Sequence, residues 1–105
     1  MKRQFIEKLS IDPYPGTLNL EILEPESIVA YQNLKTQKGI EIIPEDLSFC
    51  SARCYPVLIN GLLKAAIILP LVESYPENKM ELIASEKIKK ALSLNTGEIL
   101  EVEIL

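Results

Sequence analysis

Residues 12–22 read Asp-Pro-Tyr-Pro-Gly-Thr-Leu-Asn-Leu-Glu-Ile, and the rest of the chain is organised around them. Pro13 and Pro15 restrict φ, while Gly16 permits a positive φ, so the stretch begins with a tight, exposed turn. Apolar and polar residues then alternate, which predicts a strand over residues 17–23. A rigid turn followed directly by a half-buried strand is therefore the first structural prediction.

The polar face of this predicted strand carries two oxygen donors. Because Leu18 and Leu20 face a core, the Thr17 hydroxyl and the Asn19 amide face the other way, about 6.6 Å apart along the strand. Such hard oxygen ligands suit Mg²⁺ bound together with substrate phosphates. The alternative is that Thr17 is simply a good strand former with a solvated neighbour. Asn19 favours the functional interpretation, since asparagine is depleted in strands.

Length and composition predict one domain over residues 1–105. The chain is 48% hydrophobic and 25% charged, which is typical of a globular protein. A net charge of −4 argues against nucleic-acid binding, which needs a basic surface. There is no histidine, and the two cysteines, Cys50 and Cys54, are expected to pack as small hydrophobic residues.

Targeting and membrane signals are not found in the sequence. The N-terminus begins with basic residues, but Glu7 and Lys8 interrupt any apolar region of a signal peptide. The longest apolar run, residues 65–72, contains Pro70 and is far too short to cross a bilayer. A cytoplasmic protein without membrane association is expected.

The remaining elements follow from periodicity and from turn residues. Residues 27–34 fit either a helical turn or an irregular strand. The other predicted elements are helices over 2–9 and 86–92, the second capped by Ser85, and strands over 40–43, 52–59, 62–69, 79–83 and 99–105. Five or six strands with two short helices predict a small, mostly β barrel.

The pair Asn60-Gly61 gives the clearest local signal. It lies between two β-rich apolar runs and suits the type I′ turn of a two-residue hairpin loop. In that register Val57 faces Lys64. Pro56 cannot donate to a ladder, so this arm is expected to be an edge strand or to be bulged there.

Chemistry-bearing candidates are few. Phosphate-binding glycine motifs and nucleophile motifs are not found in the sequence. Glu81, in a predicted strand, can bind a ligand hydroxyl, or it can be a solvent-facing strand residue. The start of the predicted 86–92 helix offers N–H groups for an anion beside Lys87 and Lys89, which otherwise form the wet face of that helix.

Four segments in this order resemble the archaeal-type, CTP-dependent riboflavin kinase family. The resemblance covers residues 5–104, and its most specific part is Pro-Tyr-Pro-Gly-Thr-Leu-Asn at 13–19. The other segments are Cys-Tyr-Pro-Val-Leu-Ile-Asn-Gly at 54–61, Lys-Ala-Ala-Ile-Ile at 64–68 and Glu-Leu-Ile-Ala at 81–84. The resemblance implies a six-stranded cradle-loop barrel that transfers a phosphoryl group from CTP to riboflavin, giving FMN.

The resemblance also implies roles for individual residues. Thr17 and Asn19 would hold Mg²⁺, while Glu81 would contact the flavin and orient the attacking hydroxyl as the catalytic residue. Ser74 stands where the family has a threonine on the flavin side. The nucleotide would be cradled by Glu86, Lys87, Ile88 and Lys89. The ligands implied are riboflavin, FMN, CTP and CDP.

Two departures from the family pattern keep other hypotheses open. Family members have a strand and a glycine-rich nucleotide loop ahead of the first helix, whereas this sequence begins inside that helix, so a barrel without its first strand is one expectation. The family's Arg-Thr-His-Tyr is replaced within residues 71–76. The alternatives to a kinase are a non-catalytic flavin- or nucleotide-binding module and a structural barrel that forms homo-oligomers through an open edge.

Overall fold

The structure is a computed structural model that describes residues 2–43, 51–72 and 74–105. Its elements in chain order are α1 (Lys2–Leu9), β1 (Leu18–Glu21), α2 (Pro25–Lys35), β2 (Ile40–Ile42), β3 (Ala52–Ile59), β4 (Leu63–Pro70), β5 (Lys79–Ile83), α3 (Ile88–Ala91) and β6 (Val102–Ile104). The predicted mostly β architecture is confirmed. Three helices are described where two were expected.

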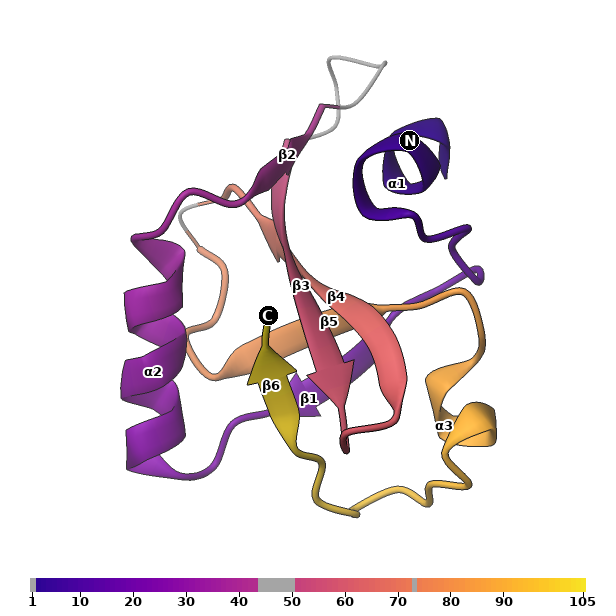
Figure 1. The fold of residues 1–105 in the computed structure, drawn as a ribbon. Coiled ribbons are helices and arrows are strands. Elements are labelled where there is room, and N and C mark those ends of the chain that lie inside the picture. The colour runs from indigo at the N-terminus through magenta and orange to yellow at the C-terminus, as the bar shows by residue number, and fades with distance from the viewer. Residues whose placement is uncertain (1, 44–50, 73) are drawn as a thin grey trace.

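The six strands form one antiparallel sheet that curls into a half-barrel (Figure 1). The strand order is β1-β5-β4-β3-β2, and β6 also pairs with β3. The β3–β4 hairpin provides the longest ladder of the sheet. Strand β1, which contains Asn19 and directly follows Thr17, lies at the end of this order and pairs with β5.

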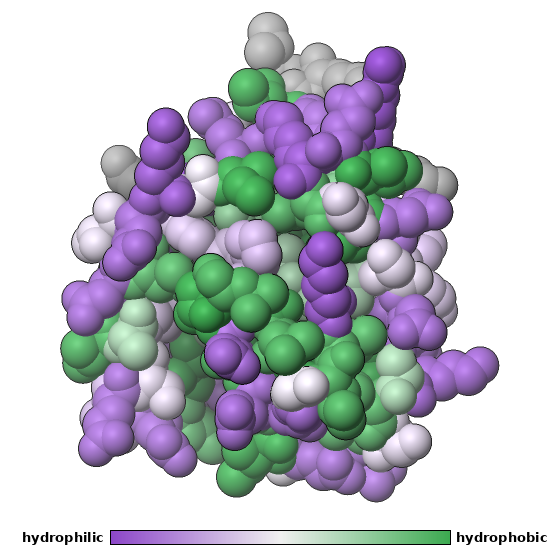
Figure 2. Space-filling model, viewed as in Figure 1, coloured by the Kyte–Doolittle hydropathy of each residue, from purple (hydrophilic) through white to green (hydrophobic). Residues whose placement is uncertain are grey.

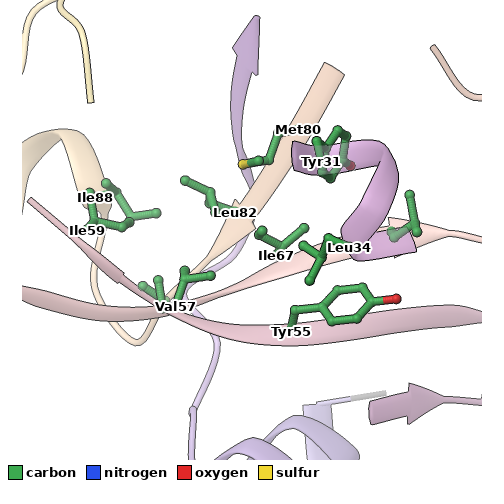
Figure 3. Packing of buried hydrophobic residues seen from close by; sticks show 12 residues of the cluster. Tyr31, Leu34, Tyr55, Val57, Ile59, Ile67, Met80, Leu82 and Ile88 are labelled. Atoms are coloured by element: carbon green, nitrogen blue, oxygen red, sulfur yellow. The ribbon is translucent and has the colours of Figure 1, made fainter. Parts of the chain in front are cut away.

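The larger core lies on one face of the sheet, against α2 (Figure 3). Within this core, one row of side chains crosses the neighbouring strands β1, β5, β4 and β3. Its members are paired residues of adjacent strands, in the order Leu18, Leu82, Ile67 and Tyr55. Helix α2 adds Tyr31 and Leu34, which lie three residues apart on one side of the helix. Each fully buried Leu or Ile contributes roughly 1.5–3 kcal/mol, so this face accounts for much of the stability of the domain.

The smaller core lies between the sheet and α1. Phe5 and Leu9, four residues apart on α1, pack with Ile42, Cys54 and Ala66. The Gln4 side chain also bonds the backbone of Ile43 just beyond β2. The predicted burial of Cys54 is confirmed, whereas Cys50 lies outside the described residues.

The predicted register of the β3–β4 hairpin was wrong by one residue. Asn60 and Gly61 both have positive φ, and the Leu62 N–H bonds the Ile59 carbonyl, so the turn itself forms as expected. Leu62 is an extra residue, 79% exposed, and the ladder starts with Ile59 opposite Leu63. This register places Val57 opposite Ala65, on one buried face, and keeps Lys64 out of the core.

The prediction for Pro56 was also wrong, because β3 lies inside the sheet. It pairs with β4 on one side and with both β2 and β6 on the other. The Pro56 carbonyl accepts a hydrogen bond from the Leu105 N–H. Because the nitrogen and the carbonyl of a strand residue point to the same side, the Pro56 nitrogen, which has no hydrogen to donate, also faces β2 and β6. Residues 52–54 of β3 pair with β2, and residues 57–59 pair with β6. Pro56 therefore falls between these two ladders.

Two helices differ from their expected form. The ambiguous residues 27–34 belong to α2, which begins with Pro25 at its N-terminus and ends at Lys35. The second predicted helix is shorter, covering only Ile88–Ala91, and its N-cap is Lys87 with no side-chain cap. Ser85 therefore does not cap it.

The surface carries apolar side chains where β6 faces the viewer, ringed by long charged residues (Figure 2). Ile104 of β6 is 47% exposed. Among the described residues, no helix is long and apolar enough to cross a membrane.

Candidate functional site

Glu81 and the predicted metal pair meet at the β1–β5 ladder. Asn19 lies directly opposite Glu81, so the two side chains project from the same face of the sheet. Thr17 immediately precedes β1, and its Oγ1 donates a hydrogen bond to Glu81 Oε1 over 3.3 Å. The sequence analysis chose Thr17 and Asn19 as a pair and Glu81 separately. The structure shows that these three residues, up to 64 positions apart in sequence, are neighbours in space.

Tyr75 contacts the same carboxylate and was not predicted as a site residue. Its hydroxyl donates to Glu81 Oε2 over 2.8 Å. Burial, the hydrogen bond to Glu81 and the charge of that carboxylate together raise the pKa of the Tyr75 phenol, which keeps it protonated as a donor. No sequence pattern pointed to this contact, because Tyr75 lies in the loop before β5. The predicted Ser74 is exposed beside it.

A cavity of about 390 Å³ lies next to this cluster. Its wall includes Thr17 and Asn19 on one side and the segment Glu86–Lys89 on the other. The predicted metal pair and the predicted nucleotide segment thus face one space. Glu81 does not line this cavity, but it adjoins the cavity through its hydrogen bond to Thr17.

Local structure explains how the two walls are held. Gly16 has φ +93°, as the turn prediction requires, and the Tyr14 N–H bonds the Ala84 carbonyl over 2.8 Å. This bond ties the turn to the chain just after β5. On the other wall Ile88 is buried in the larger core, so it anchors the segment, while Lys87 and Lys89 remain exposed. Ile88 is therefore a packing residue whose neighbours carry the charge.

The chemistry of the donors fits a hard cation. Thr17 and Asn19 offer oxygen atoms from exposed side chains beside the cavity. No group of three or more His, Cys, Asp or Glu residues that could hold a metal ion occurs in the described part of the chain. A cation between Thr17 and Asn19 would need oxygens from phosphate and water to complete its shell, as Mg²⁺ commonly does.

Fold and site together define a small antiparallel half-barrel. Beside its cavity lie the Asn19 amide of edge strand β1 and the Thr17 hydroxyl just before that strand, and Thr17 bonds the Glu81 carboxylate of β5. A family model named CTP-dep_RFKase, and described as domain of unknown function DUF120, matches residues 1–104. The chain belongs to this family of CTP-dependent riboflavin kinase domains.

Curated relatives carry the name riboflavin kinase. The protein of Methanocella arvoryzae is 42% identical over 103 residues, which cover 98% of this chain and 46% of the relative. The protein of Archaeoglobus fulgidus is 37% identical over 107 residues, which cover 99% of this chain and 45% of the relative. The protein of Methanothermobacter thermautotrophicus is 32% identical over 101 residues, which cover 96% of this chain and 79% of the relative. The chain thus spans about half the length of the first two relatives.

Proposed function

We propose that this domain transfers the γ-phosphoryl group of CTP to riboflavin, giving FMN and CDP. Family membership and the riboflavin kinase name of the relatives support the reaction. One structural observation supports the site most strongly. The oxygen pair Thr17 and Asn19 shares a cavity with Glu86–Lys89, the segment assigned to the nucleotide.

Phosphoryl transfer requires positioning and charge neutralisation more than a strong base. In the proposed reaction a terminal ribityl hydroxyl attacks the γ-phosphorus, and the bond from that phosphorus to the β–γ bridging oxygen breaks to release CDP. The proton of the attacking hydroxyl is released to water. Glu81 accepts a hydrogen bond from the attacking hydroxyl and orients it, and Ser74 contacts the flavin. Lys87 and Lys89 neutralise phosphate charge from the exposed side of the cavity wall. A chain without histidine can perform these tasks.

Thr17 and Asn19 are the residues that we expect to hold Mg²⁺. Bound there, the ion would neutralise charge on the phosphate oxygens. The Thr17 hydroxyl would then present its oxygen to the cation, while its hydrogen still points to Glu81 Oε1, with which it is bonded in the present structure. Metal and flavin sites would thus be linked through one side chain.

The decisive assay incubates the protein with riboflavin, CTP and Mg²⁺ and separates the flavins by chromatography. FMN formation that stops when CTP is omitted supports the proposal. Quenching of riboflavin fluorescence without FMN would instead favour the non-catalytic binding module. A protein that neither binds riboflavin nor forms FMN would contradict both hypotheses.

The metal assignment is tested by Thr17→Val combined with Asn19→Leu. These substitutions remove both oxygen donors from exposed positions, so we expect Mg²⁺-dependent CDP binding and FMN formation to be lost while the circular dichroism spectrum is kept. The matched control is Thr36→Val with Asn33→Leu, near the end of α2 and outside the cavity wall. Unchanged Mg²⁺-dependent binding in the first variant would remove Thr17 and Asn19 from the site.

The location and assembly of the protein follow as further proposals. We expect it in the cytoplasm, on the sequence grounds given above. Strand β1 ends the strand order of the sheet, so a second copy can pair with this edge to form a homo-oligomer. Light scattering coupled to size-exclusion chromatography tests this, and a monomer at all concentrations would contradict it.

A further inference from the structure

The Glu81 carboxylate receives two hydrogen bonds from different parts of the chain. Thr17 Oγ1 donates to Oε1 over 3.3 Å, and the Tyr75 hydroxyl donates to Oε2 over 2.8 Å. Among the described residues each carboxylate oxygen therefore has one side-chain donor, which favours one orientation of the group over the others. The Tyr75 bond is the shorter of the two, as expected for a charge-assisted hydrogen bond with good geometry.

Packing holds the Tyr75 ring independently of that bond. The ring is half-buried and packs against the larger core, and Lys79 Nζ lies 5.7 Å from the ring centroid. The Tyr75 N–H also bonds the Val72 carbonyl over 3.3 Å. The hydroxyl is therefore presented to Glu81 from a position that the loop and the core have already fixed.

We infer that Tyr75 is a positioning residue that holds the Glu81 carboxylate in the orientation required to bind riboflavin. The inference rests on the proposed function, because it assigns Tyr75 a role through the residue expected to contact the flavin. Tyr75 itself need not touch the ligand. Its hydroxyl restricts Glu81 before riboflavin binds, so less conformational freedom is lost on binding.

The test is a double-mutant cycle read out as the riboflavin dissociation constant from fluorescence quenching. Tyr75→Phe keeps the ring and its contact with Lys79 but removes the hydroxyl. We expect it to weaken riboflavin binding roughly tenfold, the effect of losing one hydrogen bond to a charged group. In a Glu81→Ala background the same substitution should change the dissociation constant by less than about twofold, since the residue through which it acts is gone.

Tyr55→Phe is the matched control. It also removes a tyrosine hydroxyl that makes a part-buried hydrogen bond, but this hydroxyl donates to the Gln37 carbonyl over 3.0 Å, outside the cluster around Glu81. Riboflavin affinity should not change in this variant. A purely structural role of Tyr75 would predict equal losses of affinity with and without Glu81.

Two outcomes overturn the inference in different ways. If the unmodified protein binds riboflavin and Tyr75→Phe binds it equally well, or if the loss is the same in the Glu81→Ala background, the positioning role fails while the proposed function stands. If the unmodified protein neither binds riboflavin nor makes FMN, the proposed function fails and the inference fails with it.

Discussion

The buried hydroxyl of Tyr31 has no hydrogen-bond partner among the described residues, and its removal should not destabilise the protein. The side chain is 3% exposed, and no residue in the described part of the chain accepts or donates a hydrogen bond at its oxygen. Figure 3 shows Tyr31 on α2 beside Met80, within the larger core. Buried tyrosine hydroxyls usually have a partner, so this one is an energetic cost to the folded state.

The magnitude follows from the cost of leaving a buried polar group unsatisfied, roughly 1–3 kcal/mol. Tyr31→Phe removes that cost but leaves a small void, which offsets part of the gain. The ring contact with Lys35 Nζ, 4.7 Å from the centroid, is kept. We therefore expect the free energy of unfolding to rise by about 1 kcal/mol, which corresponds to roughly 4 °C in Tm for a domain of this size.

The same chemical change at Tyr55 should have the opposite sign. The Tyr55 hydroxyl donates to the Gln37 carbonyl over 3.0 Å, so Tyr55→Phe loses a made hydrogen bond and should cost about 1 kcal/mol. Urea denaturation of both variants beside the unmodified protein measures the difference, expected at about 2 kcal/mol. If Tyr31→Phe loses as much stability as Tyr55→Phe, the Tyr31 hydroxyl has a partner and the reasoning is refuted.

Alkaline pH provides a second measurement of the same residue. Burial, followed by the charges of Glu81 and Tyr55, raises the pKa of Tyr31 to about 12, whereas an unfolded tyrosine titrates near 10. The unfolded state then releases its proton first, so stability should fall as the pH rises from about 10 to about 12. Tyr31→Phe should reduce this fall. An equally steep fall in the variant would assign it to other groups.

Two further predictions concern close packing and burial. Gly39→Ala should lower the free energy of unfolding by about 1–3 kcal/mol, because the added Cβ would lie 2.9 Å from the Tyr55 ring and 3.0 Å from the Cys54 carbonyl oxygen; an unchanged urea midpoint would contradict this. Burial raises the pKa of the Cys54 thiol to about 12, so in a Cys50→Ser variant it should react with Ellman's reagent at pH 8 only after unfolding, and rapid reaction of the folded protein would contradict its burial.

Local signals predicted the elements of this fold well where one periodicity dominated. The alternation after Gly16 and the run Lys79–Ile83 both gave strands, and the first helix covers residues 2–9 as expected. The segment 27–34 could not be decided locally because its β-branched residues oppose its capping signals. Burial of Tyr31 and Leu34 against the sheet favours the helix, and that information comes only from the folded chain.

The hairpin shows how a correct local signal can still give a wrong register. Asn60-Gly61 forms the turn, but the turn alone does not fix which residues pair after it. Long-range packing decides, because Ala65 and Ile67 must share a face with Val57 in the larger core. One exposed extra residue, Leu62, absorbs the difference. Register therefore depends on a contact network that no short window of sequence contains.

The candidate site shows the same division between local and long-range information. Thr17 and Asn19 were recognisable because strand alternation alone places both on the polar face. Their proximity to Glu81 depends on the pairing of β1 with β5 across more than sixty residues, and the contact of Tyr75 with Glu81 depends on the loop that precedes β5. A residue that acts through another side chain carries no pattern of its own. Such residues become visible only when the hydrogen bonds of the folded carboxylate are traced, which is why the contact between Tyr75 and Glu81 is the part of this site that most needs the double-mutant cycle.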